Sequence, residues 1–270
     1  MKKYMLDVYV ILIGLILGSF TNVCIWRIPR EESVIFPGSK CPNCGKNIRW
    51  YHNIPLLSYI LLKGKCADCN EKISVQYFVV ELLTCLALFL LYKKFGVSTE
   101  LVFSSLLTVF FIIIGGIDFY HKIIPDVLSL SLIVISLILA VFNPFILNDV
   151  QFIVSQIFDM STGNTIWYSI IYAVLSIFSV GGGMYLIAVL GELLLKKESM
   201  GGGDVKLMAA IAGFIGIYSS LVTLFIASCM GAAVGISMII FKRLDKDEPI
   251  PFGPFIVAAA YFVLLFKQKT

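Results

Sequence analysis

The chain alternates long apolar runs with shorter polar segments, and this pattern predicts its secondary structure. Each apolar run is about 14 to 25 residues long and almost free of charge, and the longer runs can cross a bilayer as an α-helix. Backbone polar groups cannot stay unpaired in lipid, so helices are the expected spanning elements. We predict an all-α polytopic membrane protein with about eight transmembrane helices. The predicted spans are roughly 5–25, 76–92, 101–117, 127–142, 166–190, 205–218, 219–241 and 250–266.

One sizeable polar segment, 26–75, interrupts this pattern. It predicts a division into a first transmembrane helix at 1–25, a small polar unit at 26–75 and a helical membrane core at 76–270. The first apolar run ends without a small-residue cleavage site, so we interpret it as a retained helix and not as a secretory signal.

Composition and charge support a membrane location. Hydrophobic residues make up 59% of the chain and charged residues 14%, whereas soluble domains are near half apolar and a quarter charged. Placing 26–75 in the cytoplasm puts 15 of the 21 Lys and Arg residues on that side, as the positive-inside rule requires. The other six are Lys2, Lys3, Lys93, Lys94, Lys267 and Lys269. The segment 143–165 has no Lys or Arg and is expected to be an outer loop. Basic residues beside apolar runs indicate a lipid bilayer as the partner and argue against nucleic acid.

Four of the seven cysteines form two Cys-x-x-Cys pairs within the polar segment, Cys41 with Cys44 and Cys66 with Cys69. Two such knuckles are typical of a tetrahedral four-thiolate zinc site. A pair of disulfides is the alternative, and the reducing cytosol disfavours it. Four thiolates leave no open coordination position, so the predicted metal is structural.

Two aspartates lie at the predicted cytoplasmic ends of spans. Asp118 follows the run 101–117, and Asp204 follows Gly201-Gly202-Gly203. Ionisable residues at membrane depth are costly and usually functional. Two carboxylates that share a proton can act as base and acid towards a peptide bond. Helix capping or an ion pathway is the alternative for the pair, and Asp126 is interpreted as a helix cap.

Motifs along nearly the whole chain resemble the bacterial prepilin peptidases. The motifs are Gly18-Ser19-Phe20-Thr21-Asn22-Val23, Arg27-Ile28-Pro29, Cys41-Pro42-Asn43-Cys44, Asn53-Ile54-Pro55, Gly64-Lys65-Cys66, Ile73-Ser74, Asp118 with Ile124-Pro125-Asp126, Gly201-Gly202-Gly203-Asp204 and Pro251-Phe252-Gly253-Pro254.

The resemblance implies a Gly-x-Gly-Asp aspartic protease with Asp118 and Asp204 as its catalytic pair. It implies cleavage of type IV prepilins or pseudopilins after a glycine, then methylation of the new N-terminus with S-adenosylmethionine in the zinc-bearing cytoplasmic region. Glu81 stands at the position the family pattern expects and is a candidate cofactor-binding residue. The chain departs from that pattern at Gln76, Tyr77 and Phe78, where the family has an arginine and a Tyr-Pro pair.

Two rival functions are compatible with parts of the pattern. A presenilin-like intramembrane aspartic protease would share the Gly-x-Gly-Asp motif but would lack the cysteine knuckles and the methyltransferase activity. A zinc-containing membrane receptor or transporter would need only the apolar spans and the metal site.

Overall fold

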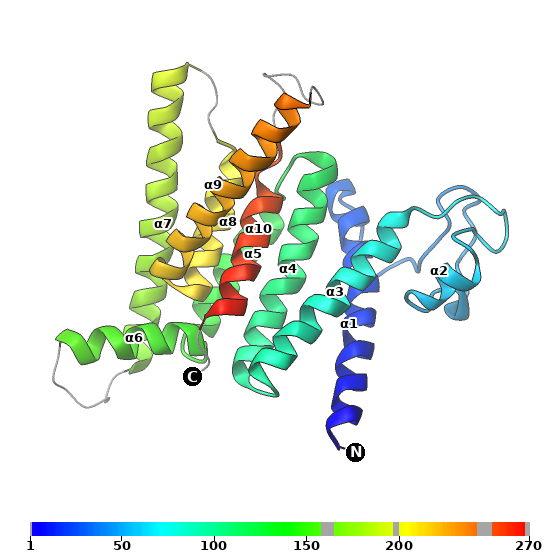
Figure 1. Ribbon diagram of the computed structural model, residues 1–270, viewed down its shortest axis with the longest axis horizontal. Coiled ribbons are helices and arrows are strands. Elements are labelled where there is room, and N and C mark those ends of the chain that lie inside the picture. The colour runs from blue at the N-terminus through cyan, green and yellow to red at the C-terminus, as the bar shows by residue number, and fades with distance from the viewer. Residues whose placement is uncertain (1, 158–164, 197–199, 242–249, 268–270) are drawn as a thin grey trace. The chain divides into compact units, whose positions relative to one another are not determined.

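The computed structural model describes residues 2–157, 165–196, 200–241 and 250–267, and this part of the chain is almost entirely helical (Figure 1). Within these residues there is no strand beyond two isolated β-bridges. The helices are α1 (Lys2–Arg27), η1 (Ile28–Arg30), η2 (Trp50–His52), α2 (Leu57–Leu61), α3 (Val75–Phe95), α4 (Thr99–His121), α5 (Asp126–Leu139), α6 (Pro144–Ile157), α7 (Thr165–Leu195), α8 (Gly202–Ile215), α9 (Ile217–Ile240) and α10 (Gly253–Phe266).

Five of the described helices are long and apolar enough to cross a membrane, which makes this a multi-pass membrane protein. They are α1, α3, α4, α7 and α9. The bent pair α5 and α6 would make a sixth span. Every one of the eight predicted segments contains a helix, but α8 and α10 have only 14 residues each, so the predicted count of eight spans is not confirmed.

The segment 143–165 was interpreted as a loop, and this is wrong for its first part, because residues 144–157 form helix α6. Asn143 starts this helix: its Oδ1 accepts the backbone N–H of Phe145 at 3.0 Å, and Pro144 suits a first helical position. Its Nδ2 donates to the carbonyl of Phe214 at 2.8 Å. Asp149 of α6 pairs with Lys267 at 3.4 Å. The axes of α5 and α6 differ by 57°. The rest of that segment lies outside the described residues, apart from Thr165, where α7 begins.

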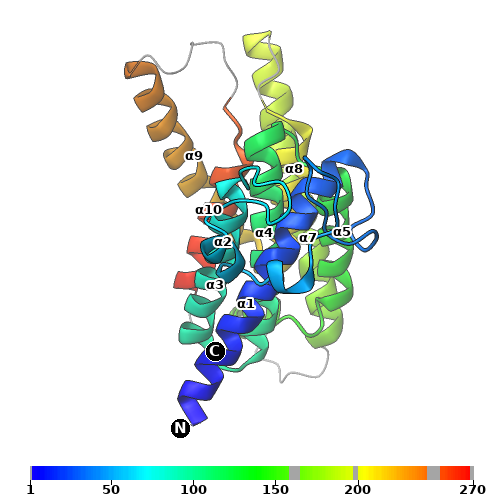
Figure 2. The same ribbon diagram turned by 90° about the vertical axis from the view of Figure 1, so that its right-hand side faces the viewer.

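The chain forms two compact units, and each is described by itself. The first contains Met1–Val97 and Ser104–Ile113, and the second contains Ser98–Phe103 and Ile114–Thr270. In the first unit α1 and α3 pack closely (Figure 2). A Cβ on Gly14 would lie 2.9 Å from the Cα of Cys85, and a Cβ on Gly18 would lie 2.7 Å from the Cα of Glu81. The small residues of this G-x-x-x-G spacing let the two backbones meet.

In the second unit α8 is the central helix. It packs against α5, α6, α7, α9 and α10 (Figures 1 and 2). Every residue from Leu207 to Ile215 is buried, as expected for a helix that is apolar on all sides. A Cβ on Gly181 of α7 would lie 2.9 Å from the Cβ of Ala209, so part of the Gly181-Gly182-Gly183 run provides close helix packing. A helix buried among other helices can be as apolar as one that crosses a membrane. The sequence pattern of α8 alone therefore predicts a span.

Candidate active site and metal centre

Asp118 lies in the last turn of α4 and is only 5% exposed. Its Oδ2 accepts the backbone N–H of Gly253 at 2.9 Å. Gly253 is the first residue of α10, where free N–H groups and the helix dipole favour a carboxylate. A Cβ at Gly253 would lie 2.6 Å from this Oδ2, so only glycine fits here without displacing the carboxylate.

Helix α4 ends at His121, three residues after Asp118, and the chain then runs towards α8. Lys122 adopts the left-handed conformation with φ 54°, and its N–H donates to the carbonyl of Asp118 at 2.8 Å. The segment that follows reaches Ile124, whose Cβ would lie 2.8 Å from a Cβ at Gly203. The glycine before Asp204 therefore lets the first turn of α8 approach the end of α4.

Asp204 lies in that first turn and is partly buried. Its backbone N–H donates to the carbonyl of Gly201 at 3.1 Å. Burial, followed by the negative charge of Asp118, raises the pKa of Asp204 to about 7. The close approach of Ile124 to Gly203 brings the two predicted aspartates into one region of the second unit, where the charge of Asp118 acts on the pKa of Asp204.

An ion pair next to this site was not anticipated from the sequence. Lys206 Nζ lies 2.7 Å from Asp126 Oδ1 and joins the first turn of α8 to the first turn of α5. The interpretation of Asp126 as a helix cap is wrong, because Pro125 occupies the cap position and Asp126 is the first helical residue. No local sequence pattern indicates this pair, because a contact across 80 residues depends on packing.

The four cysteines of the two knuckles converge. Their Sγ atoms all lie within 4.8 Å of one another, and Cys41 and Cys69 are 3.8 Å apart. None is in a disulfide. Tetrahedral zinc with Zn–S bonds near 2.3 Å would place its sulfurs about 3.8 Å apart, so the donor set and its spacing suit a thiophilic metal.

The two knuckles have the same local geometry, which explains the convergence. Each is closed by one antiparallel bridge, Lys40 with Asn47 and Lys65 with Lys72. In each knuckle the fourth residue after the first cysteine has positive φ, Gly45 at 71° and Asn70 at 58°.

Backbone N–H groups favour the thiolate at one of the four cysteines. Those of Asp68 and Cys69 lower the pKa of the Cys66 thiol to about 7, whereas burial and the neighbouring thiols raise the pKa of Cys44 to about 11.

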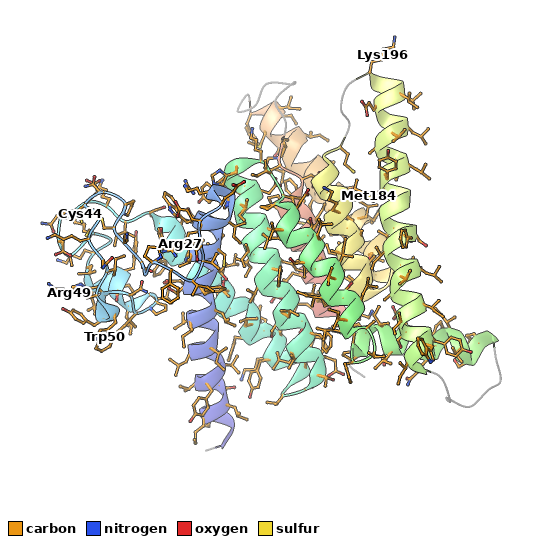
Figure 3. All side chains as sticks on the ribbon, turned by 180° about the vertical axis from the view of Figure 1, so that it is seen from behind. Arg27, Cys44, Arg49, Trp50, Met184 and Lys196 are labelled. Carbon is orange, nitrogen blue, oxygen red and sulfur yellow. The ribbon has the colours of Figure 1, made fainter. Side chains whose placement is uncertain are left out.

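Glu81 lies in the second turn of α3 and is 8% exposed. Its Oε2 accepts the backbone N–H of Leu56 at 2.8 Å. It lines a cavity of about 780 Å³ whose walls come from α1, the loop between α1 and α3, and α3 itself. Figure 3 shows Arg27 where α1 meets this loop, and Cys44 farther out in the loop. The Arg27 guanidinium holds the loop by donating to the carbonyls of Ser33 and Pro37 at 2.8 and 2.7 Å.

Comparison with known proteins identifies related chains along nearly the whole length. Residues 12–95 match the model of the bacterial peptidase A24 N-terminal domain, and residues 105–236 match that of the type IV leader peptidase family. The prepilin leader peptidase/N-methyltransferase of Pseudomonas aeruginosa is 31% identical, with 96% of this chain and 90% of that protein aligned. The proteins of the same name from Dichelobacter nodosus and Neisseria gonorrhoeae are also 31% identical, with 97% and 93% of this chain and 92% and 87% of theirs aligned. No solved structure matches the chain. By these matches the chain belongs to the type IV leader peptidase family.

Proposed function

We propose that this protein removes the leader peptide of type IV prepilin-like proteins and then methylates the new N-terminal amine. Relatives that align over about nine-tenths of their length carry the name prepilin leader peptidase/N-methyltransferase. The observation that carries the protease half is the coupled pair of Asp118 and Asp204 in the second unit. The matched family disfavours the alternative of a presenilin-like protease without methyltransferase activity.

The protease half needs one proton shared between two carboxylates. The ionised group accepts a proton from water as the water attacks the scissile carbonyl. The protonated group donates to the nitrogen as the C–N bond breaks. Gly253 stabilises negative charge on Asp118 through its N–H, while Asp204 holds its proton up to a pH of about 7. We therefore assign Asp118 as the base and Asp204 as the acid in the first step.

The metal half is structural. We assign zinc to Cys41, Cys44, Cys66 and Cys69, because these thiolates converge at tetrahedral spacing. The loop that they organise has little buried apolar surface of its own, so metal binding supplies its folding energy. We assign methylation to residues 26–75 and to the start of α3, and proteolysis to the helices within 76–270.

S-adenosylmethionine is the methyl donor in this proposal, and it supplies an electrophilic methyl group on a sulfonium. The protein must hold the freed amine, usually of phenylalanine, beside that methyl group. Substrates are prepilins or pseudopilins presented from the lipid bilayer. Both sites face the cytoplasm in the proposed topology, since most basic residues flank that side.

The test uses the purified full-length protein in lipid or detergent, a prepilin substrate and S-adenosylmethionine, with mass spectrometry of the products. The expected product has lost its leader after a glycine and gained one methyl group at the new N-terminus. A substrate cut inside its apolar helix would contradict the proposal and favour an intramembrane protease. An unprocessed substrate would contradict it altogether.

A further inference from the structure

The loop between α1 and α3 carries a group of exposed apolar side chains on η2 and α2. Trp50 is 81% exposed and Leu61 is 79% exposed, and the other two members are more than half exposed. We call this group the apolar tip, and its members are Trp50, Leu57, Ile60 and Leu61. A group of large apolar side chains on a folded surface marks an interaction site.

Helix α2 has an inward face and an outward face. Ser58 is buried on the inward face, and its Oγ donates to the carbonyl of Tyr51 at 3.1 Å, which holds η2 beside α2. Leu57, Ile60 and Leu61 are exposed and do not belong to the lining of the cavity beside Glu81. The apolar tip is therefore a second surface of the first unit, distinct from that cavity.

The apolar tip lies on the bilayer side of the loop. Both ends of the loop continue into candidate membrane spans, α1 and α3, so the loop stays close to the bilayer. Figure 3 shows Trp50 on the side of the loop nearer the N-terminal end of α1, whereas Cys44 lies on the opposite side. Figure 1 shows α2 on the same side of the loop. Because the apolar length of α1 runs in that direction from Arg27, Trp50 lies towards the level of the lipid.

The charges around the apolar tip suit lipid headgroups. Arg49 precedes the tip in sequence, Lys63 and Lys65 follow it, and all three side chains are exposed. The segment 49–65 contains no Asp or Glu. Anionic lipids attract such basic residues, and tryptophan together with long basic side chains is favoured where headgroups meet acyl chains. An apolar centre with a purely basic rim thus matches an anionic lipid surface.

We propose that the apolar tip inserts into the headgroup region of the bilayer, with its basic rim on anionic headgroups. Interfacial segments of this kind bury their apolar side chains about 5–10 Å deep. Docking would fix the loop of residues 26–75 at three places, α1, α3 and the tip. The loop would then be held against the lipid surface, where a substrate anchored in the bilayer presents its N-terminus. Only this last consequence rests on the proposed function.

The test places one molecule of the full-length protein in each lipid nanodisc, which excludes contact with a second copy. Trp26→Phe and Trp167→Phe together leave Trp50 as the single tryptophan. Lipid that is brominated in its acyl chains quenches a tryptophan lying in the bilayer, whereas acrylamide quenches one in water. Trp50 should be quenched by the lipid and protected from acrylamide, more strongly with phosphatidylglycerol than with phosphatidylcholine alone. Full quenching by acrylamide in discs of both compositions would overturn the proposal.

Leu61→Asp in the same single-tryptophan protein should release the apolar tip. The side chain is 79% exposed, so the change removes no core packing, and it places a negative charge against anionic headgroups. Trp50 should become accessible to acrylamide while the metal content stays that of the parent. Leu61→Met keeps an apolar side chain and is the matched control, which should stay protected. Equal protection in the two variants would contradict docking through the tip.

The unaltered protein gives a measure that needs no variant to fold. Trypsin should cut after Lys63 more slowly in discs with phosphatidylglycerol than in discs of phosphatidylcholine alone. Cutting after Lys46, an exposed residue two positions beyond Cys44, should not change. Equal rates after Lys63 in the two kinds of disc would argue against the basic rim meeting anionic lipid.

A prepilin is the other occupant that an apolar surface of this protein could take. If the substrate covers the tip, Trp50 will be accessible to acrylamide in discs without substrate and protected only after prepilin is added. That result would overturn lipid docking and assign the tip to substrate binding. Protection that is complete before prepilin is added supports lipid docking. Neither readout depends on cleavage or methylation, so failure of the proposed function would be seen separately.

Discussion

Single side chains account for the predicted chemistry of the protease site. Asp118 and Asp204 can divide the roles of base and acid because their surroundings differ. One carboxylate receives a helix N-terminal N–H at 2.9 Å, and the other is buried beside the first one's charge. Their catalytic roles stay predictions, and three changes at this site test them.

Removing either carboxylate should stop leader cleavage. Asp118→Asn and Asp204→Asn should each lower its rate by about 100-fold or more, because each removes half of the acid–base pair. Asp126→Asn is the matched control and should cost less, since Asp126 contacts Lys206 and is partly exposed. Rates of cleavage of a purified prepilin measure this. Normal cleavage by Asp118→Asn together with an inactive Asp126→Asn would show that the pair is wrongly assigned.

Gly253→Ala should lower the cleavage rate without changing the net charge. The added Cβ would lie 2.6 Å from Asp118 Oδ2 and must displace that carboxylate. Misplacing a catalytic group by about 1 Å can cost about 100-fold in rate. Steady-state kinetics should show the loss in kcat, with KM for prepilin little changed. Gly182→Ala is the control, since nothing lies within 4 Å of its added Cβ. Equal kcat in the two variants would remove Gly253 from the site.

The pH profile of cleavage should have an alkaline limb near pH 7. The pKa of Asp204 is raised to about 7 by burial and by the charge of Asp118. Below that pH the pair keeps the proton that the leaving nitrogen needs, and above it this proton is lost. Cleavage should therefore fall as pH rises through 7. Methylation of an already cleaved peptide should not fall, because its amine becomes neutral at higher pH. Cleavage that keeps rising well above pH 7 would contradict the assignment of the acid.

At the scale of the elements, the two proposed activities lie in different parts of the chain: the loop of residues 26–75, which carries the four cysteines, and the helices that carry the two aspartates. The loop is organised by two similar knuckles in the first unit, while the aspartates come from α4 and α8 in the second. A closed four-thiolate site offers no position for water, so it is not expected to hydrolyse a peptide bond.

Cys66→Ser should release the metal, unfold the loop and abolish methylation. Leader cleavage should survive at least in part, because the aspartate pair needs no metal. Metal analysis and product masses measure both effects. Cys229→Ser, at an exposed cysteine of α9 outside the cluster, is the control and should keep its metal. Complete loss of cleavage in a Cys66→Ser protein that still inserts and binds substrate would show that loop and aspartates form one catalytic unit.

At the scale of the whole molecule, the distribution of basic residues predicts one orientation of the chain in the membrane. Fifteen of its 21 basic residues flank the side assigned to the cytoplasm. A reporter enzyme that works only outside the cytoplasm should be active when fused after Ile157, at the end of α6, and inactive when fused after Lys196. The reverse pattern would invert the topology and place the cysteine cluster in an oxidising compartment, where disulfides would form.

The sequence by itself determined the helices and the cluster of four cysteines. Apolar runs of span length predict membrane helices because lipid leaves the backbone few alternatives. Two Cys-x-x-Cys turns predict a four-sulfur cluster because each turn is local. The prediction was wrong at α6, which occupies residues interpreted as a loop. The apolar part of α8, from Leu207 to Ile215, was predicted as a span and is buried among helices of its own unit.

Packing alone decided the contacts that shape the two sites. The bond from Gly253 to Asp118 spans 135 residues, and the pair of Lys206 with Asp126 spans 80. The cavity beside Glu81 forms because α1, the loop between α1 and α3, and α3 itself close around it. Such contacts depend on how helices approach one another to within a few ångströms. A hydrophobic period specifies which face of a helix is buried, but not which distant residue will meet it.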